Sequence, residues 1–202
     1  MAAKSGFMKD AFILFAITLI SGIALGGVYE VTKGPIEKAT IEANNKTYRG
    51  VFPEASSFEE SSEINLEECN TQLATTAFGG VGVETVMVAK DDAGSDLGYV
   101  VNSYSNDSYG GKVAISVGIK EDGSITAIGF REISDTPGLG LKAKEDAFRT
   151  QYDGKTATEL TVVKGGNAGD AEINAISGAT ITSKAVTNAV NAALYCKQNF
   201  ID

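Results

Sequence analysis

Residues 113–131 read VAISVGIKEDGSITAIGFR, and this stretch decides the class of fold. Valine or isoleucine stands at every second position from 113 to 119, which is the period of a β-strand with one buried face. Residues 121–124 (EDGS) have the composition of a hairpin turn. Residues 124–131 then return, so the stretch predicts an antiparallel hairpin whose first strand is half-buried.

Two further strands are expected before this hairpin. Residues 85–89 (TVMVA) are rich in β-branched side chains, and residues 98–101 (GYVV) follow the turn residues 91–94 (DDAG). Short turns, and not helices, join these strands. The chain is therefore predicted to be an α+β protein in which helices flank an antiparallel meander.

Residues 31–80 are expected to be a helical and acidic connecting region. A helix is predicted from Ile36 to about Tyr48, with Pro35 at its first position. Residues 54–70 contain six glutamates, and such a run predicts a solvated surface segment. Residues 79–82 (GGVG) are expected to be a flexible connection, so the folded domain is placed at 81–202.

The N-terminal region contains an apolar stretch. From Ala11 to Val28 the chain has 18 residues without a charge, near the lower limit for crossing a hydrocarbon core of ~30 Å. A cleaved signal peptide and a retained anchor both fit, and the length favours the anchor. Residues 1–30 are therefore expected to be a short cytoplasmic N-terminus and a transmembrane helix, with the main domain outside the cytoplasm.

Composition excludes several classes of function. Histidine is absent, so neither a Ser-His-Asp hydrolase nor a histidine zinc site can be built. A net charge of −9 argues against binding nucleic acid. Cys69 and Cys196 are too few for a zinc ribbon or an iron–sulfur cluster, and their pairing is left open. No metal site is expected.

The stretch 177–183 (SGATITS) precedes residues with helical spacing, and Thr182 or Ser183 is expected to cap that helix. This cap would place Thr180 beside the positive end of the helix, where free backbone N–H groups favour a phosphate. Two small residues before Thr180 let a large group approach its hydroxyl. An ordinary loop-to-helix junction is the alternative interpretation.

A second glycine motif occupies residues 136–140 (TPGLG). Proline at the first corner and glycine at the second are typical of a type II turn, which needs a positive φ at the glycine. Gly140 would let backbone come close to a partner. Alone, this motif indicates only a structural turn.

Both motifs, in this order and behind a membrane span, resemble the covalent-FMN domain of bacterial redox pumps. The resemblance is to the G subunit of Rnf electron-transport complexes, which is related to the C subunit of the sodium-translocating NADH:quinone reductase. It covers nearly the whole chain and also includes Tyr109-Gly110-Gly111 and the Asp122-Gly123 hairpin. The Ser177-Gly178-Ala179-Thr180 motif is its most specific part.

The resemblance implies that Thr180 is esterified to the phosphate of FMN by a flavin transferase that uses FAD. Thr182 is a rival attachment site. Asn174 and Asp135 stand where the family usually has Asp and Glu. No residue is expected to be catalytic by itself, and cofactor-binding roles are implied for Ser177, Gly178, Ala179, Thr182, Ser183, Thr136, Leu139 and Gly140.

The implied function is that of an electron-carrier subunit in a membrane-bound, ion-translocating ferredoxin:NAD⁺ oxidoreductase. Expected partners are the other membrane subunits, the flavin transferase and membrane lipid. The expected location is the bacterial inner membrane, with a single pass and an extracytoplasmic domain. Lys184, Arg131 and Lys142 are candidates for stabilising a reduced flavin. The alternatives are a free-standing flavinylated carrier and a non-redox anchored binding module in which Thr180 merely caps a helix.

Overall fold

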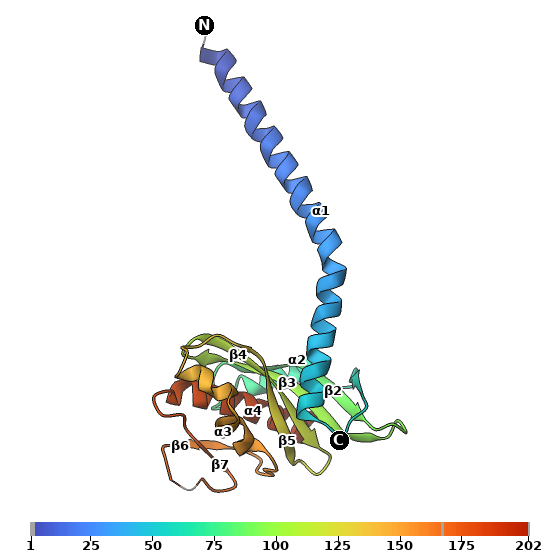
Figure 1. The fold of residues 1–202 in the computed structure, drawn as a ribbon, viewed down its shortest axis with the longest axis vertical. Helices are drawn as coiled ribbons and strands as arrows, with labels where there is room; N and C mark the ends of the chain where they lie inside the picture. Colours follow the sequence, from blue (N-terminus) through green and yellow to red (C-terminus); the bar gives the residue numbers. More distant parts are fainter. Residues whose placement is uncertain (1–2, 167, 202) are drawn as a thin grey trace. The chain divides into compact units, whose positions relative to one another are not determined.

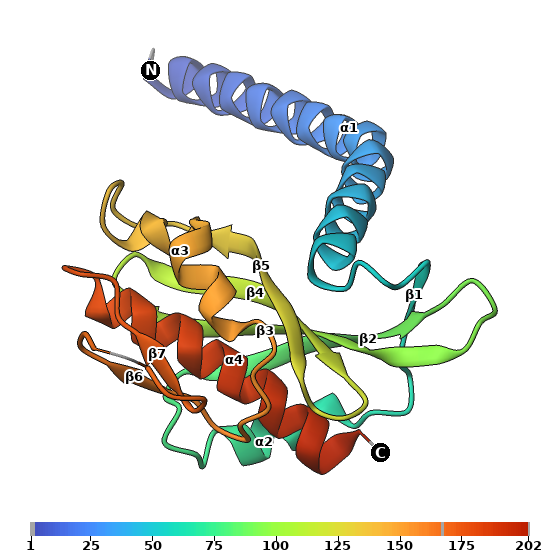
Figure 2. The same cartoon turned by 60° about the horizontal axis from the view of Figure 1, so that its bottom comes forward.

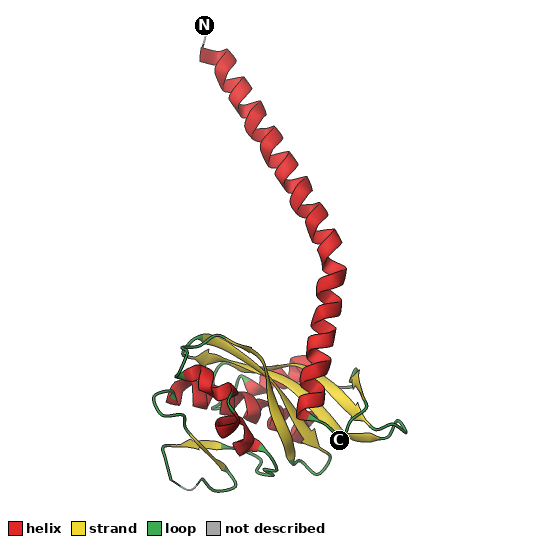
Figure 3. Cartoon of the chain, in the orientation of Figure 1, coloured by secondary structure: helices red, strands yellow, loops and turns green. Residues whose placement is uncertain are grey.

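The computed structural model describes residues 3–166 and 168–201. The chain divides into two compact units, one ending at Ala43 and the other starting at Asn44. Helix α1 (Ala3–Val51) begins in the first unit and ends in the second; it is the helix at the blue, N-terminal end of the chain in Figure 1. The second unit holds strands β1 to β7 and helices α2 to α4 (Figure 3).

The first unit contains a segment suited to a membrane. The apolar segment Met8–Gly34 of α1 is 27 residues long, and an 18-residue window within it has a mean hydropathy of 2.3 with no part of that window buried. At 1.5 Å of rise per residue this segment is about 40 Å long, enough to cross a bilayer core. Residues 36–48 are helical, as predicted, but the helix continues through Gly34 and Pro35, so the predicted separate start at Pro35 is wrong. A proline omits one backbone hydrogen bond, and here that loss does not end the helix.

Five strands of the second unit form one antiparallel sheet in the order β1-β2-β3-β4-β5. The predicted meander is therefore confirmed. The two turns foreseen in the sequence are formed: Gly123 donates to the carbonyl of Lys120 at 3.0 Å, and Gly94 to that of Asp91 at 3.1 Å. The strands are β1 (Ser57–Glu60), β2 (Val81–Lys90), β3 (Asp96–Ser108), β4 (Gly111–Lys120) and β5 (Ile125–Ile133).

All six glutamates of the acidic segment 54–70 are exposed, as their charge predicted, but the segment also has regular structure and two buried residues. It contributes β1 and most of α2 (Leu66–Leu73), in which Cys69 and Leu73 are buried. Asn65 caps α2 by accepting from the backbone N–H of Glu68 at 3.1 Å. The glutamates line the exposed side of a short amphipathic helix, and their charge hid its apolar spacing. The predicted flexible glycine connection is likewise wrong from Val81 onward, where β2 begins.

Helix α4 (Thr180–Phe200) packs along one face of the sheet, as Figure 2 shows. Its buried side chains join those of β2 to β5 in the main core. The remaining elements lie between β5 and α4 in the chain: η1 (Gly140–Lys144), α3 (Asp146–Arg149), η2 (Thr150–Tyr152) and the parallel strands β6 (Thr161–Val163) and β7 (Glu172–Asn174).

The opposite face of the sheet is also covered, so the prediction of a half-buried strand at 113–119 is wrong. Every residue of β4 from 113 to 119 is buried. The end of α1 supplies a second, smaller core through Tyr48, Val51 and Phe52. There the buried Asn102 amide donates to Tyr48 Oη at 2.8 Å and accepts from Ser116 Oγ at 2.6 Å. Small residues between the alternating valines and isoleucines leave room for this second layer.

Cys69 on α2 and Cys196 on α4 are both fully buried and are free thiols. The interaction between the two thiols lowers the pKa of Cys69, and the same interaction together with burial raises the pKa of Cys196. The two residues that the sequence left unassigned thus meet between the two helices.

Candidate functional site

One cavity of about 550 Å³ is lined by both glycine motifs. Residues about forty positions apart in sequence meet there because β5 ends, and α4 begins, at the same end of the sheet. From the turn come Thr136, Leu139 and Gly140, and from the second motif Gly178, Ala179, Thr180 and Thr182. Three further residues, which the sequence did not assign to the site, complete the wall: Tyr109, Asp135 and Ile181.

The turn at 136–140 has the predicted form. The Leu139 N–H donates to the carbonyl of Thr136 at 3.1 Å, and Gly138 has a φ of 76°, as a type II turn requires. Gly140 is needed for space, because a Cβ at this position would collide with the Asp135 carboxylate. The turn therefore places the Leu139 side chain and the Gly140 backbone on the cavity wall.

The start of α4 differs from the prediction. The helix begins at Thr180, its N-cap is Ala179, and no side chain caps it. Thr182 and Ser183 are inside the first turn, so the expectation that either caps the helix is wrong. The backbone N–H groups of Thr180, Ile181 and Thr182 thus lack intrahelical acceptors, as the first turn of any helix does. A 21-residue helix with an uncapped start favours an anion at this point.

Ser183 supports the loop that leads into α4. Its hydroxyl donates to the carbonyl of Ala179 at 2.9 Å and accepts from the N–H of Ile176 at 2.9 Å. Ser183 is fully buried and does not line the cavity. Ser177 lines a neighbouring cavity of about 280 Å³ instead. Both residues lie next to the site without facing into it.

The two candidate threonines have different surroundings. Thr182 is 1% exposed, and its hydroxyl donates to Asp135 Oδ2 at 2.7 Å. Thr180 is half-buried, lines the cavity, and its hydroxyl has no hydrogen-bond partner among the described residues. A hydroxyl that must react needs access and no competing partner. The geometry therefore favours Thr180 over Thr182 for modification.

Asp135 connects the parts of the site. Its carboxylate accepts from Ser108 Oγ at 2.9 Å, from Thr182 Oγ1 at 2.7 Å and from the Thr136 N–H at 2.6 Å. Burial acts to raise the pKa of this carboxyl, but these hydrogen bonds outweigh it and hold the pKa below its ordinary value. The sequence showed Asp135 only as a departure from a family pattern, because its partners come from distant segments.

The rim of the cavity is apolar. Tyr109, Leu139 and Ile181 are 73%, 43% and 56% exposed, and they are the exposed large hydrophobic side chains among the described residues of the second unit. Exposed apolar groups that gather at one cavity mark a binding site. Such an apolar rim suits a flat, largely apolar ring.

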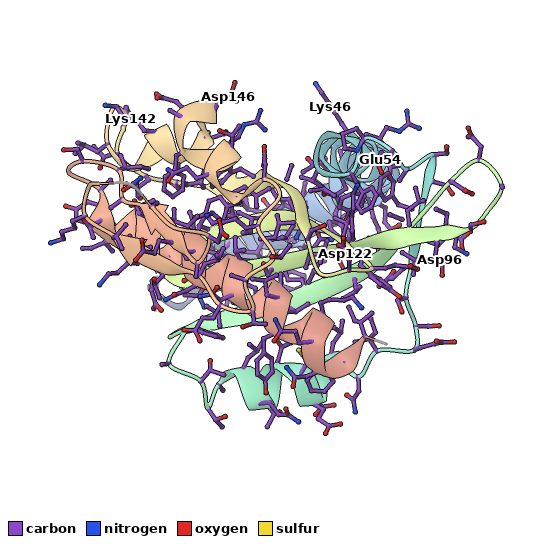
Figure 4. The ribbon with its side chains drawn as sticks, turned by 90° about the horizontal axis from the view of Figure 1, so that it is seen from below. Lys46, Glu54, Asp96, Asp122, Lys142 and Asp146 are labelled. Atoms are coloured by element: carbon purple, nitrogen blue, oxygen red, sulfur yellow. The ribbon has the colours of Figure 1, made fainter. Side chains whose placement is uncertain are left out.

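The basic residues proposed from the sequence lie elsewhere. Arg131 pairs with Glu84, whose Oε2 is 2.5 Å from the Arg131 Nη1. Lys142 lines the neighbouring cavity and lies at the edge of the domain (Figure 4), and Lys184 is exposed. None of the lysine and arginine side chains that the structure describes lines the 550 Å³ cavity. These three cations therefore do not provide the positive charge expected of them.

Asn174 lies at the end of β7, before the loop that carries Thr180. Its backbone N–H donates to Gln151 Oε1 at 2.8 Å, and Gln151 Nε2 donates to its carbonyl at 3.3 Å. Its own side-chain Oδ1 is buried without a hydrogen-bond partner. Gln151 thus fixes the backbone of the loop, and the Asn174 side chain faces the neighbouring cavity.

Comparisons with known proteins match the part of the chain that contains both glycine motifs. Residues 108–195 match the family described as FMN-binding domain. The chain is 36% identical over 199 residues to the G subunit of the Na⁺-translocating ferredoxin:NAD⁺ oxidoreductase complex of Acetobacterium woodii, with 95% of this chain and 91% of the relative covered. The corresponding G subunit of the proton-translocating complex of Clostridium ljungdahlii is 32% identical over 193 residues, with 92% of each covered.

The chain belongs to the family of G subunits of ion-translocating ferredoxin:NAD⁺ oxidoreductase complexes. The resemblance stated from the sequence is therefore confirmed. A solved structure with a similar fold is the C subunit of the Na⁺-translocating NADH-quinone reductase from Parabacteroides distasonis. It is 22% identical, its TM-score is 0.54, and the match covers 79% of this chain and 82% of that one. This likeness supports the α+β fold of the present member of the G-subunit family.

The residues present fit an FMN group. The uncapped first turn of α4 suits a phosphate, and the cavity of about 550 Å³ is within the ordinary range for a small ligand. The apolar rim suits a flavin ring, and the Thr180 hydroxyl, which has no hydrogen-bond partner among the described residues, lies at the helix start. This member of the G-subunit family thus has the surface that an FMN-binding domain requires.

Proposed function

We propose that this chain is the electron-carrier subunit of a membrane-bound, ion-translocating ferredoxin:NAD⁺ oxidoreductase and carries FMN covalently on Thr180. The observation that carries the proposal is the free, accessible Thr180 hydroxyl at an uncapped helix start inside a cavity with an apolar rim. The relatives named above are subunits of such complexes. Family membership and local geometry therefore support the same function.

The attachment is a phosphoryl transfer. The Thr180 hydroxyl oxygen forms a new bond to the FMN-side phosphorus of FAD, the pyrophosphate P–O bond to the AMP half breaks, and AMP leaves. The hydroxyl proton passes to a base on the flavin transferase. The chain's own contribution is position: Gly178, with a φ of 80°, bends the loop, and the first-turn N–H groups of α4 face the phosphate position.

The bound flavin supplies the electron chemistry, and the protein supplies its placement. Leu139, Ile181 and Tyr109 exclude water from the ring, and the Gly140 backbone lies on the cavity wall. A covalent tether keeps the cofactor at a fixed, high local concentration. Such a tether matters most where a released flavin would be lost by dilution.

The location proposed is the bacterial inner membrane, crossed once by residues Met8–Gly34, with the flavin domain on the extracytoplasmic side. The partners proposed are the other membrane subunits of the complex, the flavin transferase and membrane lipid. A covalent flavin on the outer side needs no retention by a closed pocket, which agrees with the open, half-exposed site around Thr180.

The test is co-expression of the full-length chain with a flavin transferase, followed by intact mass and peptide mapping. The wild type should gain the mass of one FMN less one water, located on the peptide with Thr180. Thr180→Ala should abolish this gain, and Thr182→Ser, which keeps the hydroxyl that binds Asp135, should retain it. A colourless, unmodified wild-type chain would favour the binding-module alternative. Purification of a flavinylated chain without membrane partners would favour the free-standing carrier.

A further inference from the structure

The lining of the 550 Å³ cavity contains one carboxylate and no basic side chain. That carboxylate belongs to Asp135, which lies between the glycine turn and the first turn of α4. The other described residues of the lining carry neither a carboxylate nor an ammonium or guanidinium group. The permanent charge on the cavity wall is therefore negative.

The structure holds this charge in place from three segments. Ser108 at the end of β3, Thr136 in the turn and Thr182 in α4 all donate hydrogen bonds to the Asp135 carboxylate, at 2.6–2.9 Å. Gly140 leaves the space that the carboxylate occupies, since any side chain there would collide with it. Three donors stabilise the ionised form, so Asp135 stays charged across the neutral range.

A fixed negative charge acts on any redox group beside it. Reduction adds negative charge to a flavin, and a neighbouring carboxylate in a partly dehydrated cavity makes that addition less favourable. No lysine or arginine of the lining offsets this effect. The consequence is a lower midpoint potential than the same cavity would give with a neutral side chain.

We propose that Asp135 sets the redox potential of the flavin in this cavity by placing an ionised carboxylate on its wall. The proposal rests on the proposed function, because it needs a flavin attached at Thr180. Asp135 acts on the potential through its charge and does not exchange electrons or protons itself. It makes the carrier a stronger reductant toward its acceptor.

A purely structural role is the competing explanation, because Asp135 also joins three segments. Asp135→Asn separates the two roles. The amide keeps the size, its oxygen can still accept from Thr136, and the hydroxyls of Ser108 and Thr182 can turn to accept from its NH₂ group. The substitution therefore removes the charge while preserving most of the hydrogen bonds. Asp135→Glu keeps the charge and serves as the conservative control.

The experiment is a spectroscopic redox titration of the full-length, flavinylated chain in detergent. At a fixed ambient potential, Asp135→Asn should raise the ratio of reduced to oxidised flavin about tenfold, equivalent to about 59 mV for a one-electron step. Asp135→Glu should return it towards the wild-type value. An unchanged potential in Asp135→Asn would overturn the proposal, even if the unfolding temperature of the unmodified chain falls.

A second variant decides the matter if Asp135→Asn does not fold or take up flavin. Ser108→Ala keeps the Asp135 carboxylate but removes one hydrogen bond that partly offsets its negative charge. Ser108 itself does not line the cavity. The ratio of reduced to oxidised flavin should then fall below that of the wild type. A ratio that stays constant or rises contradicts the proposal. A wild-type chain that takes up no flavin overturns the proposed function instead, which distinguishes the two failures.

Discussion

The two ends of helix α4 are built in opposite ways. At its start the cap is an alanine, Ile181 is 56% exposed, and the Thr180 hydroxyl has no partner among the described residues. In its second half, buried side chains make specific hydrogen bonds to the surrounding elements. Asn191 alone makes two bonds to the backbone of Leu160, at 2.8 and 2.9 Å. The comparison shows one helix whose buried side chains hold it to the domain, while the backbone N–H groups of its first turn are left open for a ligand.

The largest effect on stability is expected from breaking the buried hydrogen bonds in the second half of α4. Asn191→Ala would leave the N–H and the carbonyl of Leu160 buried without partners, at a cost of about 3 kcal/mol in the free energy of unfolding. Urea unfolding of the detergent-solubilised chain measures this cost. Asn199→Ala, on the exposed side of the same helix, should change it by less than about 0.5 kcal/mol. Equal effects in both variants would contradict the comparison.

A smaller effect is expected at the loop that leads into α4. Gly178 has a φ of 80°, so Gly178→Ala forces an L-residue into the left-handed region, which costs roughly 1–2 kcal/mol. The new Cβ would also lie 3.2 Å from Leu139 Cδ2 and disturb the cavity wall. Unfolding and the rate of flavin attachment should both change.

Gly154→Ala is the matched control for this loop. Gly154 lies outside both motifs and has a φ of 75°. No neighbouring heavy atom lies within 4 Å of the position that its Cβ would take. The variant should show a similar loss of stability with a normal rate of flavin attachment. A slower attachment in Gly154→Ala would mean that attachment reports general stability and not the geometry of the loop.

Tyr152 tests the buried side of α4 through pH. Its hydroxyl is hydrogen-bonded to Thr187 Oγ1 at 2.8 Å, and burial raises the pKa of Tyr152 well above its ordinary value. In the unfolded chain this tyrosine ionises near pH ~10, so its stabilising contribution is complete below that pH and is lost as the pH rises further. Tyr152→Phe should cost about 1 kcal/mol at neutral pH and flatten the alkaline decline. Parallel stability profiles for the two proteins would refute this account.

The smallest effect on stability is expected at the open end. Ile181→Ser removes an exposed side chain, so the free energy of unfolding should change by less than about 0.5 kcal/mol. The loss of one apolar group from the rim should nevertheless admit water to the bound flavin. Quenching of flavin fluorescence by iodide should therefore increase. Unchanged quenching together with a large loss of stability would reverse the roles assigned to the two ends.

Local patterns in the sequence predicted those parts of the fold that depend on neighbours along the chain. The hairpin around Gly123 and the turn at Gly138 were predicted because their conformations need particular residues at fixed offsets. The burial of the second face of β4 was not predicted. Alternation identifies one buried face, and the small residues on the other face are equally typical of an exposed one. The buried face of α2 was hidden for a related reason, since the helix lies at the end of a run of glutamates and has two of them in its first turn.

The site was predicted in part for the same physical reason. Thr180 and the glycine turn are carried by contiguous motifs, and the structure brings them to one cavity. Asp135 and Tyr109 were not assigned to it, because their roles depend on contacts between segments that are distant in sequence. The start of α4 was placed three or four residues late, with the cap expected at Thr182 or Ser183 and found at Ala179. Thr182 and Ser183 have the composition of caps, but tertiary hydrogen bonds to Asp135 and Ile176 engage their hydroxyls.

With FMN attached at Thr180 as proposed, the missing cap of α4 would link cofactor loading to the lifetime of the polypeptide. A helix start without a side-chain acceptor forgoes roughly 1 kcal/mol, and a phosphodiester at Thr180 would supply the acceptor. The loaded protein should therefore resist proteases longer than its unloaded precursor. A cell that degrades the less stable form would remove copies that missed maturation, which is a simple quality control on assembly.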